Sequence, residues 1–301
     1  MARIEARRTA GFLLGLLAGG LVGCGSSPPA RAVHSPIAAP ACGSEIAGEE
    51  KLTAPLVLVG DLHGTREIPA TFGDLVCHAA AGRRGQTILV GLEIPASEQA
   101  AFDAFLDGDA GADAARGLLA QEFWQREYQD GRSSQAMLGL LGELRRQRKA
   151  GLKVVLRGLD PQHYDSPSDR DAKMAATLSE AITAVRPAQT LVLIGNVHSR
   201  TLNGYPWDAK AAYVPFGALL RARYCGLIAL DVRNLGGSAW MCTSDVARDC
   251  GAHPLRERET TGPVPRVELD PAAALNPGYS GALLVGKVTA SPPARLEIQE
   301  P

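Results

Sequence analysis

Residues 56–64 read LVLVGDLHG: an uninterrupted apolar run of strand length that ends in Gly60, Asp61 and His63. Runs of the same kind occur at residues 87–91, 153–156 and 190–195. Strands that are apolar on both faces are typical of a parallel sheet covered on both sides. The chain therefore has the strands of a buried parallel sheet.

Helical patterns fill the intervals between these runs. They lie at residues 69–83, 97–106, 112–127, 133–150 and 168–185. This alternation predicts an α/β fold with a mostly parallel central sheet, helices on both faces and a helical insert at about residues 97–150. Further along we expect a short helix at 219–223, strands at 224–232, 239–243 and 281–290, and an irregular, proline-rich segment at 248–277.

Polar side chains follow each of the four runs. They are Asp61, His63 and Glu67 after the first, Glu93 after the second, Arg157 and Asp160 with the third, and His198 and Arg200 after the fourth. The carboxyl ends of parallel strands lie along one edge, where open α/β proteins bind ligands. We therefore expect groups that are distant in sequence to meet there.

The two histidines share the spacing Gly-x-x-His, which favours a functional role for both His63 and His198. Glu93 would be costly to bury without a partner. These three groups could ligate a divalent metal such as Mn²⁺ or Zn²⁺, or perform acid–base chemistry directly. Asp160 is a further catalytic candidate, although it could instead cap the next helix.

Four more residues are candidates for the surroundings of the site. Arg157 and Arg200 could position a carboxylate or an oxyanion, or serve as structural ion-pair partners, which is the role we favour for Arg157. Asp61 and Glu67 are the next carboxylates in reach.

The N-terminal residues resemble the signal peptide of a bacterial lipoprotein. Three arginines precede an apolar run at residues 11–22, which leads into Leu21-Val22-Gly23-Cys24. We expect residues 1–23 to be a signal peptide, Cys24 to be lipidated, residues 24–50 to be a flexible tether and residues 51–301 to be one α/β domain. The resemblance implies a cell-envelope protein anchored in a membrane, and Gly25 favours the outer membrane, facing the periplasm.

The composition limits the classes of molecule that the protein can bind. The chain of 301 residues is 46% hydrophobic and 21% charged, with a net charge of −1, which argues against nucleic acid as a partner. Besides Cys24 there are five cysteines, Cys42, Cys77, Cys225, Cys242 and Cys250. Cys242 and Cys250 could close a short loop, but the full pairing and the oligomeric state stay open.

Two families share motifs with the chain. Asp61-Leu62-His63-Gly64 resembles the first motif of calcineurin-like metallophosphoesterases, but the late Gly-His-x-His motif of those enzymes is absent. The chain more closely resembles the Tiki/TraB superfamily, in residues 60–65, in Leu92-Glu93 and in Gly195-Asn196-Val197-His198. Members of that superfamily typically carry Glu two positions before the first His, where this chain has Asp61.

The resemblance implies three functions. Tiki-like members imply divalent-metal peptidase chemistry, and erythromycin esterases imply water activation against an ester. The leading hypothesis is therefore a lipid-anchored hydrolase of a peptide or small-molecule substrate. ChaN-like lipoproteins imply haem or iron binding instead, for which Tyr205 and Tyr213 are candidate axial ligands besides the histidines. A third possibility is a member whose site is purely structural.

Overall fold

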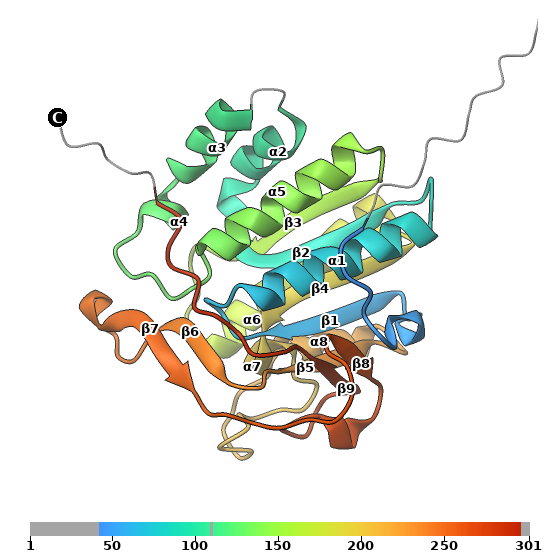
Figure 1. The fold of residues 1–301 in the computed structure, drawn as a ribbon, viewed down its shortest axis with the longest axis vertical. Coiled ribbons are helices and arrows are strands. Elements are labelled where there is room, and N and C mark those ends of the chain that lie inside the picture. Colours follow the sequence, from blue (N-terminus) through green and yellow to red (C-terminus); the bar gives the residue numbers. More distant parts are fainter. Residues whose placement is uncertain (1–41, 109–110, 296–301) are drawn as a thin grey trace, which may run out of the picture. The chain divides into compact units, whose positions relative to one another are not determined.

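Seven strands form the central sheet of the computed structural model, which describes residues 42–108 and 111–295 (Figure 1). They are β1 (Leu56–Asp61), β2 (Ile88–Pro95), β3 (Val154–Asp160), β4 (Gln189–Gly195), β5 (Ile228–Arg233), β8 (Arg266–Glu268) and β9 (Gly281–Leu284), in the order β3-β2-β4-β1-β5-β9-β8. Every neighbouring pair is parallel except β8 with β9. The prediction of a mostly parallel sheet is confirmed.

Helices cover both faces of this sheet. Apolar residues of α1 (Glu67–Gly82), α2 (Gln99–Asp107) and α5 (Gln135–Lys149) pack against one face, and those of α6 (Pro167–Val185) and α8 (Phe216–Arg223) against the other. Successive strand residues enter opposite cores, as Val57 and Leu58 do in β1. Both residues are fully buried, which explains why these strands are apolar throughout.

The insert between β2 and β3 consists of four helices, α2, α3 (Gly111–Leu119), α4 (Glu122–Gln125) and α5. The single helix expected at 112–127 is in fact two, α3 and α4. Phe123 and Trp124 in the short α4 are buried in the same core as α5. Short 3-10 turns complete the chain at Glu49–Lys51, Ala96–Glu98, Ala247–Asp249 and Pro271–Ala273.

The segment expected to be irregular, 248–277, contains two strands. β7 (Cys250–Leu255) pairs antiparallel with β6 (Gly237–Cys242) in a ribbon of its own, and β8 joins the central sheet. Their side chains are mostly half-buried or exposed, so they leave no apolar run in the sequence. The strand expected at 281–290 ends at Leu284.

The packed domain begins before the expected end of the tether. Cys42 forms a disulfide with Cys77 in α1, and Ile46 is 2% exposed in the core. Residues 42–50 are therefore attached to the domain, which corrects the boundary expected at residue 50. Cys24 and the expected signal peptide lie outside the described residues. Within 42–108 and 111–295, no helix has the length and apolar character needed to cross a bilayer.

The register of the strands brings together the carboxyl ends that carry the candidate site residues. β1 pairs with β4, so that Asp61 lies opposite Gly195, and β2 flanks β4 on its other side. The chain after β4 turns at once into α7 (Asn196–Ser199), a single helical turn that carries His198. Three segments that are far apart in sequence thus end at the same edge.

Candidate active site

His63, Glu93 and His198 meet at the carboxyl edge of the sheet, as expected. Nε2 of His63 lies 3.4 Å from Oε2 of Glu93, and Nε2 of His198 lies 3.8 Å from Oε1. Gly195 stands between the three, because a Cβ placed on it would lie 3.2 to 3.3 Å from all of them. The backbone N–H of Gly195 also donates to Oε2 of Glu93 at 2.8 Å. A side chain at position 195 would therefore disturb the arrangement.

Each imidazole is oriented by its own aspartate. Nδ1 of His63 lies 2.7 Å from Asp61, and Nδ1 of His198 lies 2.7 Å from Asp171. A carboxylate at Nδ1 fixes the proton there and leaves Nε2 to act in the site. The structure thus contains two Asp–His pairs that point their Nε2 atoms at one glutamate.

Asp171 lies in the first turns of α6 and is completely buried. Besides His198, it accepts hydrogen bonds from the hydroxyl of Tyr213 at 2.6 Å and from the backbone N–H of Phe216 at 2.8 Å. A buried carboxylate is stable only when its oxygens are satisfied in this way. Asp171 therefore ties His198 to both α6 and the start of α8.

Two arginines close the inner side of the cluster. Arg170 donates to Glu93 at 2.7 Å, to Asp160 at 2.7 Å and to Nε2 of His198 at 3.0 Å. Arg132 donates to the second oxygen of Asp160 at 2.5 Å and pairs with Asp130. Asp160 thus joins the cluster as the anchor of two guanidinium groups. It does not cap α6, since Ser166 does so.

These contacts set the protonation of the central groups. Burial lowers the pKa of His63, but the carboxylates of Glu93 and Asp61 outweigh it and raise that pKa to about 10. Burial would raise the pKa of Glu93, yet His198, His63 and Arg170 hold it well below its usual range. At neutral pH, Glu93 is therefore an anion that faces an imidazolium at His63.

A cavity of about 420 Å³ opens onto both imidazoles. Its walls include His63, His198, Val197, Tyr128, Met241 and Cys242. The β6–β7 ribbon supplies the last two and is closed by the Cys242–Cys250 disulfide, which confirms that this pair can close a short loop. The ribbon is fastened to the helical insert, because the indole N–H of Trp240 donates to the carbonyl of Gln129 at 2.9 Å.

Three residues that we expected beside the site, Glu67, Arg157 and Arg200, do not contact the cluster. Glu67 accepts from the backbone N–H of Thr289, and the buried guanidinium of Arg200 donates to the carbonyls of residues 202–204 and 277. Arg200 therefore fixes a loop. Arg157 is half-buried on β3 and, among the described residues, has no ion pair, so the structural partnership favoured for it is wrong.

Four charged residues of the cluster were not expected from the sequence. They are Asp130, Arg132, Arg170 and Asp171. None of them follows a strand: two lie in the loop before α5 and two in the first turns of α6. The only available signal was the density of charge at 169–171, which reads Asp-Arg-Asp.

The cluster does not have the donor arrangement of a metal site. Among the described residues, no three His, Cys, Asp or Glu side chains are placed to hold a metal ion together. The guanidinium of Arg170 donates to Oε1 of Glu93 and to Nε2 of His198, two of the atoms that would face a metal ion. A cation at that position would meet a positive charge, so the expected metal ligands His63, Glu93 and His198 do not fit a divalent ion as they stand.

The tyrosines considered as haem ligands are engaged elsewhere. The Tyr213 hydroxyl is hydrogen-bonded to Asp171, and its ring is stacked on that of Tyr205 with centroids 4.3 Å apart. Tyr213 is 3% exposed and supports His198 from behind.

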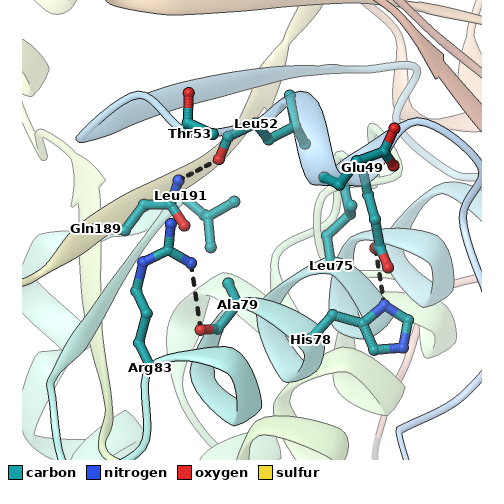
Figure 2. A pocket seen from close by; sticks show the side chains of 10 residues that line it. Glu49, Leu52, Thr53, Leu75, His78, Ala79, Arg83, Gln189 and Leu191 are labelled. Carbon is teal, nitrogen blue, oxygen red and sulfur yellow. Dashed lines mark hydrogen bonds and ion pairs between the residues drawn. The ribbon is translucent and has the colours of Figure 1, made fainter.

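A second cavity, of about 200 Å³, lies at the amino end of β4, on the opposite edge of the sheet (Figure 2). His78 in α1 points toward Glu49 there, with Nδ1 at 2.8 Å from the carboxylate. This pair has no contact with the cluster around Glu93 among the described residues, so His78 provides a matched control for histidine substitutions in the site.

Comparisons with known proteins support the fold. No family model and no curated protein matches the chain. A succinoglycan biosynthesis protein superposes with a TM-score of 0.50 at 9% identity, over 68% of this chain and 72% of that one. An erythromycin esterase mutant in its open conformation gives 0.48 at 12% identity over 67% and 76%, and a Bacillus cereus protein gives 0.46 at 12% over 81% and 91%.

The superposition on the succinoglycan biosynthesis protein shows a shared α/β fold and says nothing about the reaction. Membership of the Tiki/TraB superfamily stays a prediction. The chain has the mixed α/β fold, with a mostly parallel central sheet, that the sequence predicted.

Proposed function

We propose that this protein is a hydrolase that activates water against the carbonyl carbon of an ester or amide. One observation carries the proposal: two imidazoles, each oriented by a buried aspartate, converge on Glu93 and line the same open cavity. A purely structural network would not require both rings to face that cavity.

His63 is the proposed base. A water in the cavity gives a proton to Nε2 of His63 as its oxygen attacks the carbonyl carbon, and Glu93 and Asp61 stabilise the imidazolium that forms. The tetrahedral intermediate then expels the alkoxide or amine, which takes the proton back from His63. Atoms and charges balance without a further reactant.

Arg170 supplies the opposite charge. Because Asp171 accepts from Nδ1 of His198, Nε2 of that ring is an acceptor for the guanidinium of Arg170. The guanidinium puts a fixed positive charge behind the cavity, where negative charge develops on the carbonyl oxygen. Fixed charges of this kind act without reorganisation during the reaction.

The test is a panel of carboxylic esters and amides hydrolysed by the wild type, by His63→Ala and by His78→Ala. We expect His63→Ala to lose at least about 10²-fold in kcat/KM, the range for a general base. His78→Ala also removes a histidine paired with a carboxylate, and should keep the wild-type rate. Equal turnover by all three proteins would remove His63 from the mechanism.

A chelator arm completes this test. Since the cluster presents a guanidinium where a cation would bind, we expect the same rate before and after dialysis against EDTA. Activity that disappears and returns with Mn²⁺ or Zn²⁺ would show that Arg170 moves aside for a metal.

We also propose that the protein acts in the cell envelope, held there by a lipid on Cys24. The disulfides Cys42–Cys77 and Cys242–Cys250 support an oxidising compartment, because disulfides are rare in the cytosol. Cys24→Ala should move the protein from the membrane fraction to the soluble fraction. An unchanged distribution would contradict the anchor.

A further inference from the structure

Trp207 lies in the loop between α7 and α8 with 74% of its surface exposed. Its ring is stacked on Tyr205 with centroids 5.1 Å apart and planes at 8°, and Tyr205 is stacked in turn on Tyr213. An exposed indole costs free energy in water, and this one ends a row of three stacked aromatic rings. One flat face of the indole is therefore left open to a ligand.

A cavity of about 270 Å³ borders this ring. Its lining is Trp207, Pro206, Tyr279, Val197, Asn196 and Asn276, with no charged side chain among them. Asn276 is half-buried, and within the described residues only its backbone N–H is bonded, to Asp231, so its side-chain amide is free for a ligand. The cavity thus offers an aromatic face and a free amide, and it matches an uncharged ligand that has polar groups at its edge.

This cavity adjoins the candidate active site. Asn196 and Val197 line both it and the larger cavity that contains His63 and His198. Both residues belong to α7, the single turn that also carries His198. A group bound beside Trp207 would therefore extend from a substrate whose scissile bond lies at the imidazoles.

We propose that the Trp207 cavity binds a neutral sugar ring of the substrate, so that the protein hydrolyses an ester or amide attached to a carbohydrate. The proposal rests on the hydrolase function above. The C–H face of a pyranose is apolar and packs on an indole, while its hydroxyls need partners such as the Asn276 amide. A carboxylate or ammonium group would find no counter-charge in this lining.

Binding can be tested without any reaction. Of the three tryptophans, Trp124 is fully buried and Trp240 is half-buried and bonded to Gln129. Trp207 alone lines this cavity, so it is the tryptophan that a ligand there would shield from a soluble quencher. Methyl glycosides and short neutral oligosaccharides should protect wild-type fluorescence from acrylamide, and Asn276→Ala, which keeps the fluorophore, should weaken that protection. Isothermal titration calorimetry, which needs no fluorophore, should show that Trp207→Ala loses sugar binding and that Trp207→Phe, which keeps an aromatic face, retains part of the affinity. Sugars that give the wild type no protection, or that bind Trp207→Ala as tightly as the wild type, would overturn the proposal.

A kinetic arm tests the same site in the reaction. For an acylated sugar, Trp207→Ala should raise KM about tenfold with kcat unchanged, which is the loss expected for one stacked ring. For the methyl ester of the same acid, the two proteins should agree. An equal rise for both esters, or no rise for either, would contradict the sugar site.

The two arms separate this inference from the proposed function. If no ester or amide is cleaved but the wild type binds sugars and Trp207→Ala does not, as calorimetry measures, the site stands and the hydrolase function fails. If esters are cleaved through His63 but Trp207 affects neither binding nor KM, the function stands and the sugar site fails.

Discussion

His63 lies between Asp61 and Glu93, and these carboxylates raise its pKa to about 10 against the opposing effect of burial. At pH 7 only a small fraction is neutral and able to accept a proton. We therefore expect kcat/KM for ester hydrolysis to rise with pH and to level off near pH 10. In Asp61→Asn one of the charges that raise the pKa is gone, so the rise should occur at lower pH.

The same linkage affects stability, which provides a control. Because the folded pKa of His63 exceeds its unfolded value of 6.5, the protonated pair stabilises the fold fully below that value and loses this effect as pH rises through about 10. Urea unfolding should therefore separate wild type from Asp61→Asn more at pH 6 than above pH 10. A flat rate profile together with equal stabilities would contradict the charge pairing of His63.

Asp171 is a positioning residue, since it touches His198 and not the cavity. In the wild type the carboxylate of Asp171 accepts from His198, Tyr213 and Phe216. Asp171→Asn places an amide N–H against these donors, so we expect kcat to fall about 10²-fold with a small change in KM. Tyr213→Phe removes one donor only and should cost less than about tenfold, the value of one hydrogen bond. Steady-state kinetics measures both, and equal losses in the two variants would show that Asp171 has no special part.

Some of the site residues could be predicted from the sequence, and others could not. His63, Glu93, His198 and Asp160 could be predicted because each follows an apolar run in the sequence, and the carboxyl ends of parallel strands share an edge. Arg170 and Asp171 could not, because burial of paired charges on a helix leaves no periodic pattern. Arg200 also follows a strand, but its guanidinium turns to loop carbonyls, a choice that depends on the fold of residues 202–204.

Among the elements, the junction of β4 with α7 holds the site together. Gly195→Ala would put a methyl group 3.2 to 3.3 Å from His63, Glu93 and His198, closer than ordinary contact. Its backbone, with φ of −47°, accepts alanine, so the fold should persist while kcat/KM falls at least tenfold. Gly139→Ala on the exposed face of α5 meets no atom and should keep full activity while adding about 0.5–1 kcal/mol of stability. Full activity of Gly195→Ala would contradict the convergence.

The two disulfides have different positions and should act differently. Cys42–Cys77 closes 35 residues and Cys242–Cys250 closes 8, so chain entropy gives losses of about 4 and about 2.5 kcal/mol on their removal. Only the second lies in the wall of the active-site cavity. Paired Cys-to-Ser variants should therefore show a larger loss in free energy of unfolding for the first and a raised KM only for the second. A KM that rises only when Cys42–Cys77 is removed would contradict this assignment.

Element prediction succeeds where burial is complete. The strands β1, β2, β3 and β4 are nearly or wholly buried and appear as apolar runs. β6 and β7 pair only with each other and are partly exposed, so their sequence shows neither alternation nor a continuous run. The ribbon that forms one wall of the cavity was for that reason only half predicted.

In the whole molecule, the order of the strands in the central sheet brings segments together that are distant in sequence. Since β4 lies between β1 and β2, the polar residues at the ends of all three strands share one edge. The loop before α5 brings Arg132 to the same place, and the first turns of α6 bring Arg170. The fold class followed from strand and helix alternation. The strand order did not, because local patterns contain no information on which strands are neighbours.

The central claim is that His63 and His198 work as one unit at this edge. Its most direct measurement is kcat/KM for one ester with the wild type, His63→Ala, His198→Ala and the double variant. Residues that act together are not additive, so the double variant should be about as slow as the slower single variant. Losses that multiply, or a single variant at the wild-type rate, would show that the two histidines do not share a reaction.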